Sequence, residues 1–287
     1  MIYRDLPIFV GAANQNPNTI NNNYYLMASQ VSIDMSAGGQ AKRKINQSIN
    51  QSDQFTHPNP LVCRVSFQSY IPGSDTEGLV IPDLSWAAKI IFTQATGDNY
   101  HAIKIGESIF DKCYLSNYTV SIDPFRPVQL TAEFICNDPP TGGGISEKIN
   151  GVDSFVGSIS FADNIIHGHT CNVIGANNIV SEIQSSIKYQ VTCNRTPVYG
   201  IGSIMPSSMI LDEIERQMDI SSTDISSIIN QEGAKLTSPV TVALKHSNSS
   251  ITAYLNMNAG SKILSQKIQM QEGDSLMTEV SIKEFLV

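Results

Sequence analysis

Short stretches in which apolar and polar residues alternate recur along the whole chain, and they predict a mainly β protein. In the first half these stretches cover 25–35, 61–71, 99–105, 112–122 and 128–136. In the second half they cover 183–193, 240–245, 251–257, 263–270 and 276–285. Because successive side chains of a strand point to opposite faces, each strand is expected to have one buried and one polar face.

The two halves of the chain follow the same plan, since each ends in a predicted hairpin. Turn-forming residues at 123–127 and at 271–275 separate the paired strands. A shift of about 150 residues places the first hairpin on the second, which indicates an internal repeat. A cluster of Pro and Gly at 137–144 lies between the halves and is typical of a boundary. We therefore expect two domains, 1–145 with an N-terminal arm and 146–287.

Helical spacing is found in two segments. Over 207–218, apolar residues recur at intervals typical of one helix face and follow a serine that can serve as N-cap. A shorter helix is expected over 83–91, which contains the single tryptophan. Each half is therefore predicted to be a β-sheet domain with one helix packed against it.

Composition and charge narrow the class of protein. The 287 residues are 41% hydrophobic and 15% charged, with a mean hydropathy of −0.07, which argues against a disordered chain and against a membrane protein. The net charge of −8 opposes tight binding to a nucleic-acid backbone, which needs a basic surface. It still permits a wall along which DNA slides. The N-terminal residues do not match a signal peptide, so we expect assembly in a cytoplasm.

Residues with reactive side chains form no recognisable catalytic motif. Five cysteines without a close pair are expected to be buried free thiols. His167, His169 and Cys171 would share one face of a strand and could ligate zinc, but no fourth ligand lies nearby in the sequence. We therefore predict no catalytic, cofactor or metal site. The alternatives left open from other classes are a metal-dependent hydrolase at these three residues and a secreted, glycosylated adhesin.

Several segments together resemble the phage tail tube proteins. In the first half they are the strand Ser-Gln-Val-Ser-Ile-Asp at 29–34, the basic loop at 42–44 and the closing hairpin over 113–134. In the second half, 185–202 resembles the first strand of that family with its extended loop, and 265–271 with 279–285 resembles its last hairpin. The chain is thus similar to two tandem tail-tube-like domains.

The resemblance implies a fold and an assembly. Each domain would be a β-sandwich or half-barrel with a flanking helix, and its open sheet edges would close by joining neighbours into a ring. Rings of this family are generally sixfold, so two domains per chain imply a trimeric pseudo-hexamer. A true hexamer, in which the extra domain decorates the outside, is the other arrangement.

The function implied by the resemblance is that of a structural virion protein, not an enzyme and without a cofactor. Stacked rings would form the channel for genome delivery in the tail of the virion, after assembly in the host cytoplasm. The expected partners are further copies of the chain, other phage tail proteins (sheath, tape measure, baseplate or terminator) and DNA during its passage, with no membrane insertion. A baseplate hub or tail terminator with the same duplicated fold is the alternative.

Candidate residues follow from the predicted faces and loops. The polar face of the hairpins is expected to line the channel, where acidic side chains would repel phosphate. Its candidate residues are Asp123, Glu133, Glu272, Asp274 and Glu279. The extended loops at 37–54 and 194–206 are expected to join stacked rings, and their candidate contacts are Lys42, Arg43, Lys44, Arg195 and Tyr199.

Overall fold

Strands make up most of the described chain, as the alternating stretches predict. In the computed structural model the described residues are 6–15, 25–36, 39–41, 56–58, 62–71, 84–106, 108–138, 140–142, 165–175, 184–222, 233–245, 251–269 and 277–286. The strands of the first half are β1 (Leu6–Val10), β2 (Tyr25–Ser36), β3 (Gly39–Ala41), β4 (Thr56–Pro58), β5 (Val62–Tyr70), β6 (His101–Ile105), β7 (Ser108–Ile122), β8 (Gln129–Cys136) and β9 (Thr141–Gly142). Those of the second half are β10 (Asn172–Ile174), β11 (Gln184–Tyr199), β12 (Pro206–Ser222), β13 (Val240–Lys245), β14 (Ile251–Met257), β15 (Lys262–Gln269) and β16 (Met277–Leu286).

The short helix predicted in the first half is confirmed. Helix α1 (Leu84–Lys89) continues directly into a turn of π-helix, η2 (Ile90–Gln94), and together they bury Ala87 and Ile91 in the core. A 3-10 turn, η4 (Gly168–Thr170), lies in the second half. Within the described ranges, no helix has the length and apolar content that crossing a membrane requires.

Six strands of the first half close into a barrel. Their order is β7, β6, β1, β2, β5 and β8, and β8 pairs back with β7 to complete the circle. The core includes the stacked rings of Phe67 and Phe134, whose centroids are 6.2 Å apart. The structure is thus a closed barrel, whereas the sequence predicted a sandwich or half-barrel. The pair of strands that closes it, β7 and β8, is the predicted hairpin around 123–127.

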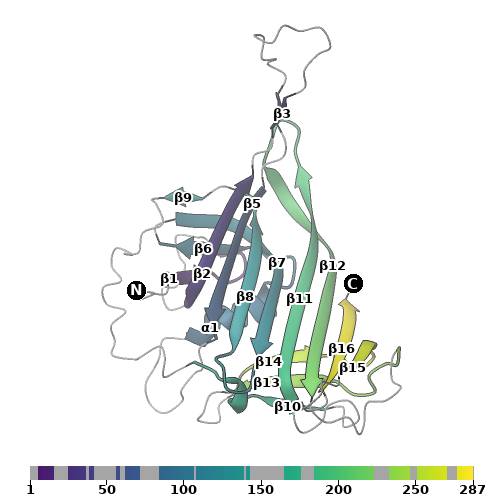
Figure 1. Cartoon of the computed structure of the whole chain (residues 1–287). Coiled ribbons are helices and arrows are strands. Elements are labelled where there is room, and N and C mark those ends of the chain that lie inside the picture. Colours follow the sequence, from purple (N-terminus) through teal and green to yellow (C-terminus); the bar gives the residue numbers. More distant parts are fainter. Residues whose placement is uncertain are drawn as a thin grey trace, which may run out of the picture.

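Strand β7 belongs both to the barrel and to a second group of strands, because it is longer than its barrel neighbours β6 and β8. Along one edge, its first residues, 108–113, pair with β6, and its last residues, 117–122, pair with β11. From β11 the sheet continues through β12 and β16 to β15. The strands β2, β5, β8, β7, β11, β12, β16 and β15 therefore form one antiparallel run (Figure 1).

A separate sheet of three strands, β10, β13 and β14, covers the apolar side of this run in the second half. The two layers are joined by a shared core and by the Tyr189 hydroxyl, which donates a hydrogen bond to the Asn256 carbonyl at 3.1 Å. Buried side chains of the small sheet and of the run belong to one cluster, which includes Val242, Leu244, Leu255, Met257, Ile187, Met218, Val280 and Ile282.

The helix predicted over 207–218 is wrong, because these residues form most of strand β12. This strand pairs with β11 on one side and with β16 on the other. Its register against β11 shifts by one residue at Asp212, since Asn194 pairs with Glu213 whereas Arg195 pairs with Leu211. This β-bulge interrupts the period of two, so the apolar residues on either side fall at intervals that imitate a helix face.

Two sets of four strands repeat one topology. The first is β2, β5, β8 and β7, and the second is β11, β12, β16 and β15. A shift of 148 residues carries the pair Leu115 and Phe134 onto the pair Ile263 and Ile282, and the bulge after Leu115 recurs after Ile263. The internal repeat is therefore present in strand order and register, with an offset slightly below the expected one.

The first two strands of each set match in the same way. Ala28 of β2 pairs with Ser69 of β5, and a bulge follows before Gln30. Gln184 of β11 pairs with Ser222 of β12, and a bulge again follows before the next pair. The other strands do not repeat, because β1 and β6 close the barrel whereas β10, β13 and β14 form the separate sheet. The domain boundary at 145/146 lies outside the described residues and stays a prediction.

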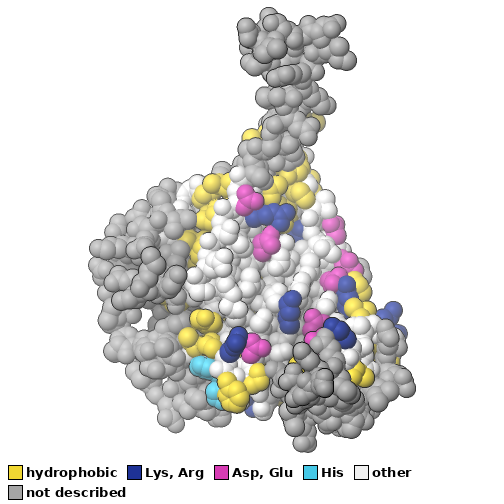
Figure 2. All heavy atoms as spheres, in the orientation of Figure 1, with side chains coloured by type: hydrophobic (Ala, Val, Ile, Leu, Met, Phe, Trp, Pro, Cys, Tyr) yellow, Lys and Arg dark blue, Asp and Glu magenta, His cyan; other side chains and the backbone are white. Residues whose placement is uncertain are grey.

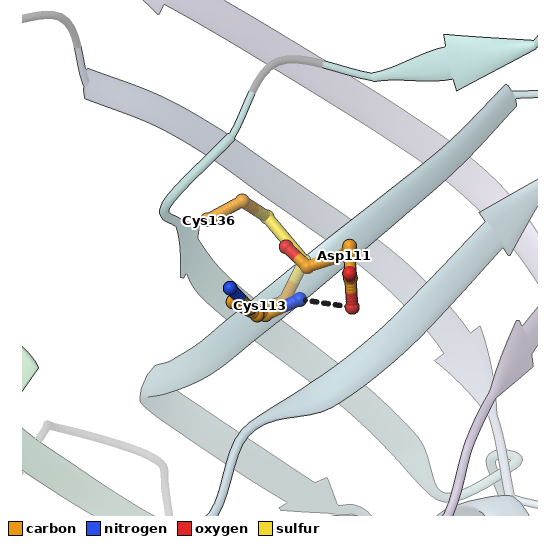
Figure 3. The surroundings of a disulfide bond; sticks show 4 residues. Asp111, Cys113 and Cys136 are labelled. Atoms are coloured by element: carbon orange, nitrogen blue, oxygen red, sulfur yellow. Dashed lines mark hydrogen bonds between the residues drawn. A yellow bond between two sulfur atoms is a disulfide. The ribbon is translucent and has the colours of Figure 1, made fainter. Parts of the chain in front are cut away.

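Two of the five cysteines are joined, which corrects the expectation of free thiols at those positions. A disulfide links Cys113 of β7 with Cys136 of β8 (Figure 3). Beside it, the backbone N–H of Lys112 donates a hydrogen bond to the Asp111 carboxylate at 2.8 Å. Cys63, Cys171 and Cys193 are free. Burial raises the pKa of the Cys63 and Cys171 thiols to about 11, so both remain protonated near neutral pH.

Candidate functional site

The eight-stranded run has one apolar face, which lies in the core, and one polar face. Because side chains alternate along each strand, residues between the buried positions share the polar face. In the first four strands these are Ser32, Asp34, Arg64, Ser66, Gln68, Asn117, Thr119, Ser121, Thr131 and Glu133. In the second four they are Lys188, Gln190, Thr192, Glu215, Gln217, Asp219, Ser265, Lys267, Glu279, Ser281 and Lys283. Figure 2 shows this face as a broad, mostly uncharged surface with a few charged side chains.

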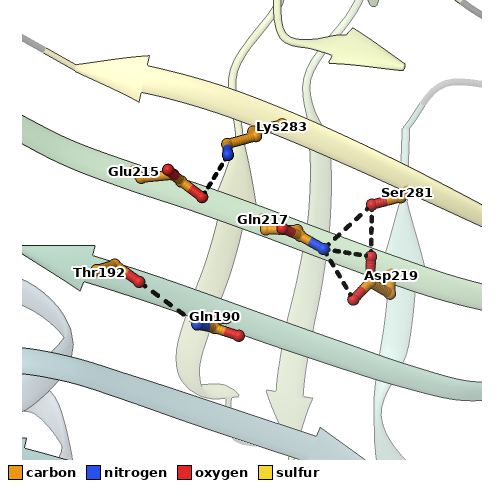
Figure 4. Close-up of polar contacts among 7 residues, drawn as sticks. All are labelled: Gln190, Thr192, Glu215, Gln217, Asp219, Ser281 and Lys283. Carbon is orange, nitrogen blue, oxygen red and sulfur yellow. Dashed lines mark hydrogen bonds and ion pairs between the residues drawn. The ribbon is translucent and has the colours of Figure 1, made fainter. Parts of the chain in front are cut away.

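Two ion pairs lie on the described part of the polar face. The Arg64 guanidinium lies 2.7 Å from the Glu133 carboxylate, which also accepts a hydrogen bond from the Asn117 amide at 2.9 Å. On the second half, the Lys283 ammonium lies 2.6 Å from the Glu215 carboxylate (Figure 4). The described part of this face is therefore mixed and mainly neutral, and the acidity expected of a channel lining is not concentrated on it.

A further polar network crosses β12 and β16 (Figure 4). The Gln217 amide donates to the Asp219 carboxylate at 2.9 Å and to the Ser281 hydroxyl at 3.2 Å. The Ser281 hydroxyl in turn donates to the same carboxylate at 2.6 Å. These bonds pair the Gln217, Asp219 and Ser281 side chains with one another within the face.

The structure places the predicted lining residues in different settings. Glu133 and Glu279 both lie on the polar face, from β8 and β16. Asp123 follows β7 in the turn of the first hairpin and is half-buried. Glu272 and Asp274 lie outside the described residues. The basic residues of the same face, such as Arg64 and Lys188, were missed by sequence reasoning, although their place in the alternation of their strands could have found them.

Strands β11 and β12 extend beyond their neighbours as a two-stranded ribbon, defined here as residues 194–213. Strand β7 pairs with β11 only up to Thr192, and β16 pairs with β12 only from Ile214. Beyond these points the two strands pair with each other alone among the described residues, and the ribbon reaches toward the top of Figure 1. Its large exposed apolar side chains are Ile201, Ile204 and Ile210.

The base of the ribbon is fixed to the barrel by Arg195. Its Nε donates to the Leu115 carbonyl at 2.8 Å and one terminal nitrogen donates to the Gly97 carbonyl at 2.5 Å. The guanidinium also lies 5.3 Å from the centre of the Tyr114 ring, and burial lowers its pKa. Arg195, predicted as a contact between rings, thus has partners within its own chain. Tyr199 lies further along the ribbon and is half-buried, and Lys42, Arg43 and Lys44 lie outside the described residues.

His167 directly precedes η4 and His169 lies within it, so the strand expected to align them with Cys171 is not formed. The two imidazole rings are 5.7 Å apart, and His169 stacks on Phe125 of the first hairpin turn at 6.2 Å. Among the described residues, no group of three or more His, Cys, Asp or Glu side chains could hold a metal ion. The Gly168 N–H donates to the Arg126 carbonyl at 3.0 Å, so this segment attaches the second half to the turn.

We expect Gly168→Ala to lower the free energy of unfolding by about 2–3 kcal/mol, because an added methyl group overpacks a closed site. A Cβ at this position would meet the carbonyl group of Asp123 well inside van der Waals contact. Urea unfolding followed by circular dichroism measures the effect. Gly200→Ala is the matched control, because no atom lies within 4 Å of a Cβ built there. Equal stability of the two variants would contradict the close packing of the 165–171 segment on the turn.

Comparison of the chain with models of known protein families and with curated proteins finds no match.

Proposed function

We propose that the chain is the subunit of a phage tail tube, a structural virion protein whose stacked rings enclose the channel for genome delivery. The observation that carries the proposal is the repeated four-stranded unit. Two units in one chain join edge to edge into a single sheet with one buried face and one polar face. A sheet built by adding like units can be continued by further copies of the chain.

The polar face suits the wall of a channel. Serine, threonine, asparagine and glutamine side chains dominate it, and cations such as Arg64 and Lys283 are neutralised by carboxylates. Tight binding of DNA requires many unpaired cations that displace counterions from the phosphates. A face with few such cations lets DNA, or a tape-measure protein, move along it without being held.

The repeat favours a ring of three chains over one of six. Both units contribute equivalent strands to the same sheet. Neither unit is therefore expected to lie outside the wall of the ring, as the second domain of a true hexamer would. A head-to-tail contact between units closes into a ring when the rotation between successive units divides the full circle. Three chains then supply the six units of a pseudo-hexamer.

In this proposal, two connections between strands make the contacts between stacked rings, and the two are equivalent in the repeat. Strand β2 corresponds to β11 and β5 corresponds to β12, so the β2–β5 connection and the ribbon occupy matching places in the two units. Burial of the exposed isoleucines of the ribbon against another protein surface would stabilise the assembly. In this role Arg195 positions the ribbon, and Tyr199 and the apolar tip make the contact.

Negative-stain electron microscopy of the purified, untagged protein over a range of concentrations tests the proposal. We expect tubes of stacked rings with an open central channel and threefold or pseudo-sixfold rings in end view. Isolated rings that never stack would instead assign the chain as a baseplate hub or tail terminator. Compact monomers at every concentration would overturn the tube function.

A further inference from the structure

The two strands that join the two units of one chain, β7 and β11, have counterparts in the repeat at the two ends of the eight-stranded run, β15 and β2. We call the pairing of β7 residues 117–122 with β11 residues 187–192 the internal seam. In the repeat, the corresponding segment of β15 begins at Ser265, and that of β2 begins at Val31. The outer edges of these two segments have no strand partner among the described residues, because β1 pairs only with 25–28 of β2 and the bridge to β15 is at Lys262.

We propose that β15 of one copy pairs with β2 of the next copy in the register of the internal seam. This inference rests on the proposed ring assembly and names the surface through which the ring closes. The second copy is the occupant because the chain already contains this junction once, made by equivalent strands. Strand edges without a partner, as these two are among the described residues, also favour aggregation, and mutual pairing would remove that risk.

The register follows from the repeat. In the internal seam Tyr189 lies opposite Val120, and Gln190 lies opposite Thr119. The shift of 148 residues carries Val120 to Ile268. The matching bulges of β2 and β11 carry Tyr189 to Ile33. The seam between copies is therefore expected to place Ile33 opposite Ile268, and Asp34 opposite Lys267.

On the apolar side of these free edges, side chains are exposed at positions whose equivalents in the internal seam are buried. In the internal seam, Val120 and Val191 are fully buried, at 0% exposed. Their counterparts at the free edges are Ile268, 49% exposed, and Met35, 51% exposed. Because the same positions are covered where a partner strand is present, pairing between copies would bury both side chains.

The polar side of the same edges carries complementary charges. Asp34 is an exposed carboxylate beside Arg64 of β5, and Lys267 is an exposed ammonium opposite Glu279 of β16. In the proposed register the row runs Arg64, Asp34, Lys267, Glu279, so its charges alternate across the junction. The internal seam has neutral Gln190 and Thr119 at this place. Opposite charges directly across a strand pair favour it, and like charges disfavour it.

Charge reversal tests the predicted register. We expect Asp34→Lys and Lys267→Asp each to raise the concentration at which half of the chains are in rings by about tenfold, since each places like charges opposite each other at every junction. The double variant should return this concentration to near the wild-type value. Sedimentation velocity measures it. Arg126→Asp is the matched control, because this exposed arginine lies in the turn of the first hairpin, outside either free edge.

Cysteine cross-linking tests the contact itself and does not depend on the size of the charge effect. Asp34→Cys protein is mixed with Lys267→Cys protein under mild oxidation, so that any disulfide between the new thiols joins two copies. We expect a covalent dimer on a non-reducing gel, which neither variant gives alone. Arg64→Cys mixed with Lys267→Cys is the control, since Arg64 lies one strand further from the edge, about 5 Å beyond Asp34.

The outcomes separate the seam from the tube function. Rings or tubes that form without the cross-link, and without any effect of charge reversal, would overturn the seam and leave the tube function in place. Cross-linked open chains or dimers that never close would support the seam and overturn the tube. Wild-type protein that stays monomeric at every concentration would overturn both.

Discussion

Replacing Ile201 and Ile204 together by aspartate should leave the proposed rings intact and strongly weaken their stacking into tubes. Both side chains are exposed at the end of the ribbon, Ile201 fully and Ile204 to 48%. A carboxylate buried against an apolar surface loses its hydration without gaining a partner. We expect the protein concentration needed for stacking to rise by about 100-fold or more, because burying an unpaired charge costs several kcal/mol.

Electron microscopy and light scattering measure this effect on the same samples. Tyr254→Asp is the control for a general effect of added charge, because Tyr254 is 51% exposed on the small sheet, away from the ribbon. The ribbon itself should fold in the double variant, since Arg195 and the hydrogen bond between Thr196 and Asp212 at its base are unchanged. Normal tubes from the double variant would show that stacking uses another surface.

Tyr118→Ala should lower the free energy of unfolding by about 3–5 kcal/mol, the usual cost of deleting a large buried side chain. Tyr118 lies on β7 at the internal seam and is only 2% exposed. Its ring packs against Phe92, at a centroid distance of 5.2 Å, and against Tyr189 of the second half, at 6.1 Å. The variant therefore removes contacts that hold the two halves together.

The Tyr118 hydroxyl contributes less than its ring. It is hydrogen-bonded to the Tyr189 hydroxyl, which itself donates to the Asn256 carbonyl. Tyr118→Phe should therefore cost about 0.5–1.5 kcal/mol, the net value of one hydrogen bond. Tyr254→Ala, at an exposed tyrosine, should stay within about 0.5 kcal/mol of wild type. Urea unfolding measures all three variants, and a Tyr118→Ala variant as stable as Tyr254→Ala would mean that the seam adds nothing to stability.

Local alternation was sufficient for most strands. Strands β13 and β14 begin and end at the residues that the pattern predicts, 240–245 and 251–257. It failed for 207–218, because the bulge at Asp212 breaks the period of two and the pairing with β11 and β16 outweighs helix propensity. A bulge depends on the partner strand, so a single strand read by itself does not reveal it.

The candidate site was predicted in part for the same reason. Alternation is enough to place Glu133 and Glu279 on the polar face of their strands. It does not say that Arg64 lies beside Glu133, or that Arg195 turns toward the carbonyls of Leu115 and Gly97, because those partners are distant in the chain. The disulfide between Cys113 and Cys136 likewise depends on the register of the β7–β8 hairpin.

By itself, the sequence determined that the chain is mainly β, which face of each hairpin is buried, and that the closing hairpins of the two halves correspond. These properties depend on side-chain alternation and turn residues within short segments. Only the tertiary structure decided that β7 divides one edge between β6 and β11, that matching bulges align the two units, and that β2 and β15 keep unpaired edges in the described chain. Strand partners are chosen by the packing of distant segments against one core, which local patterns do not encode.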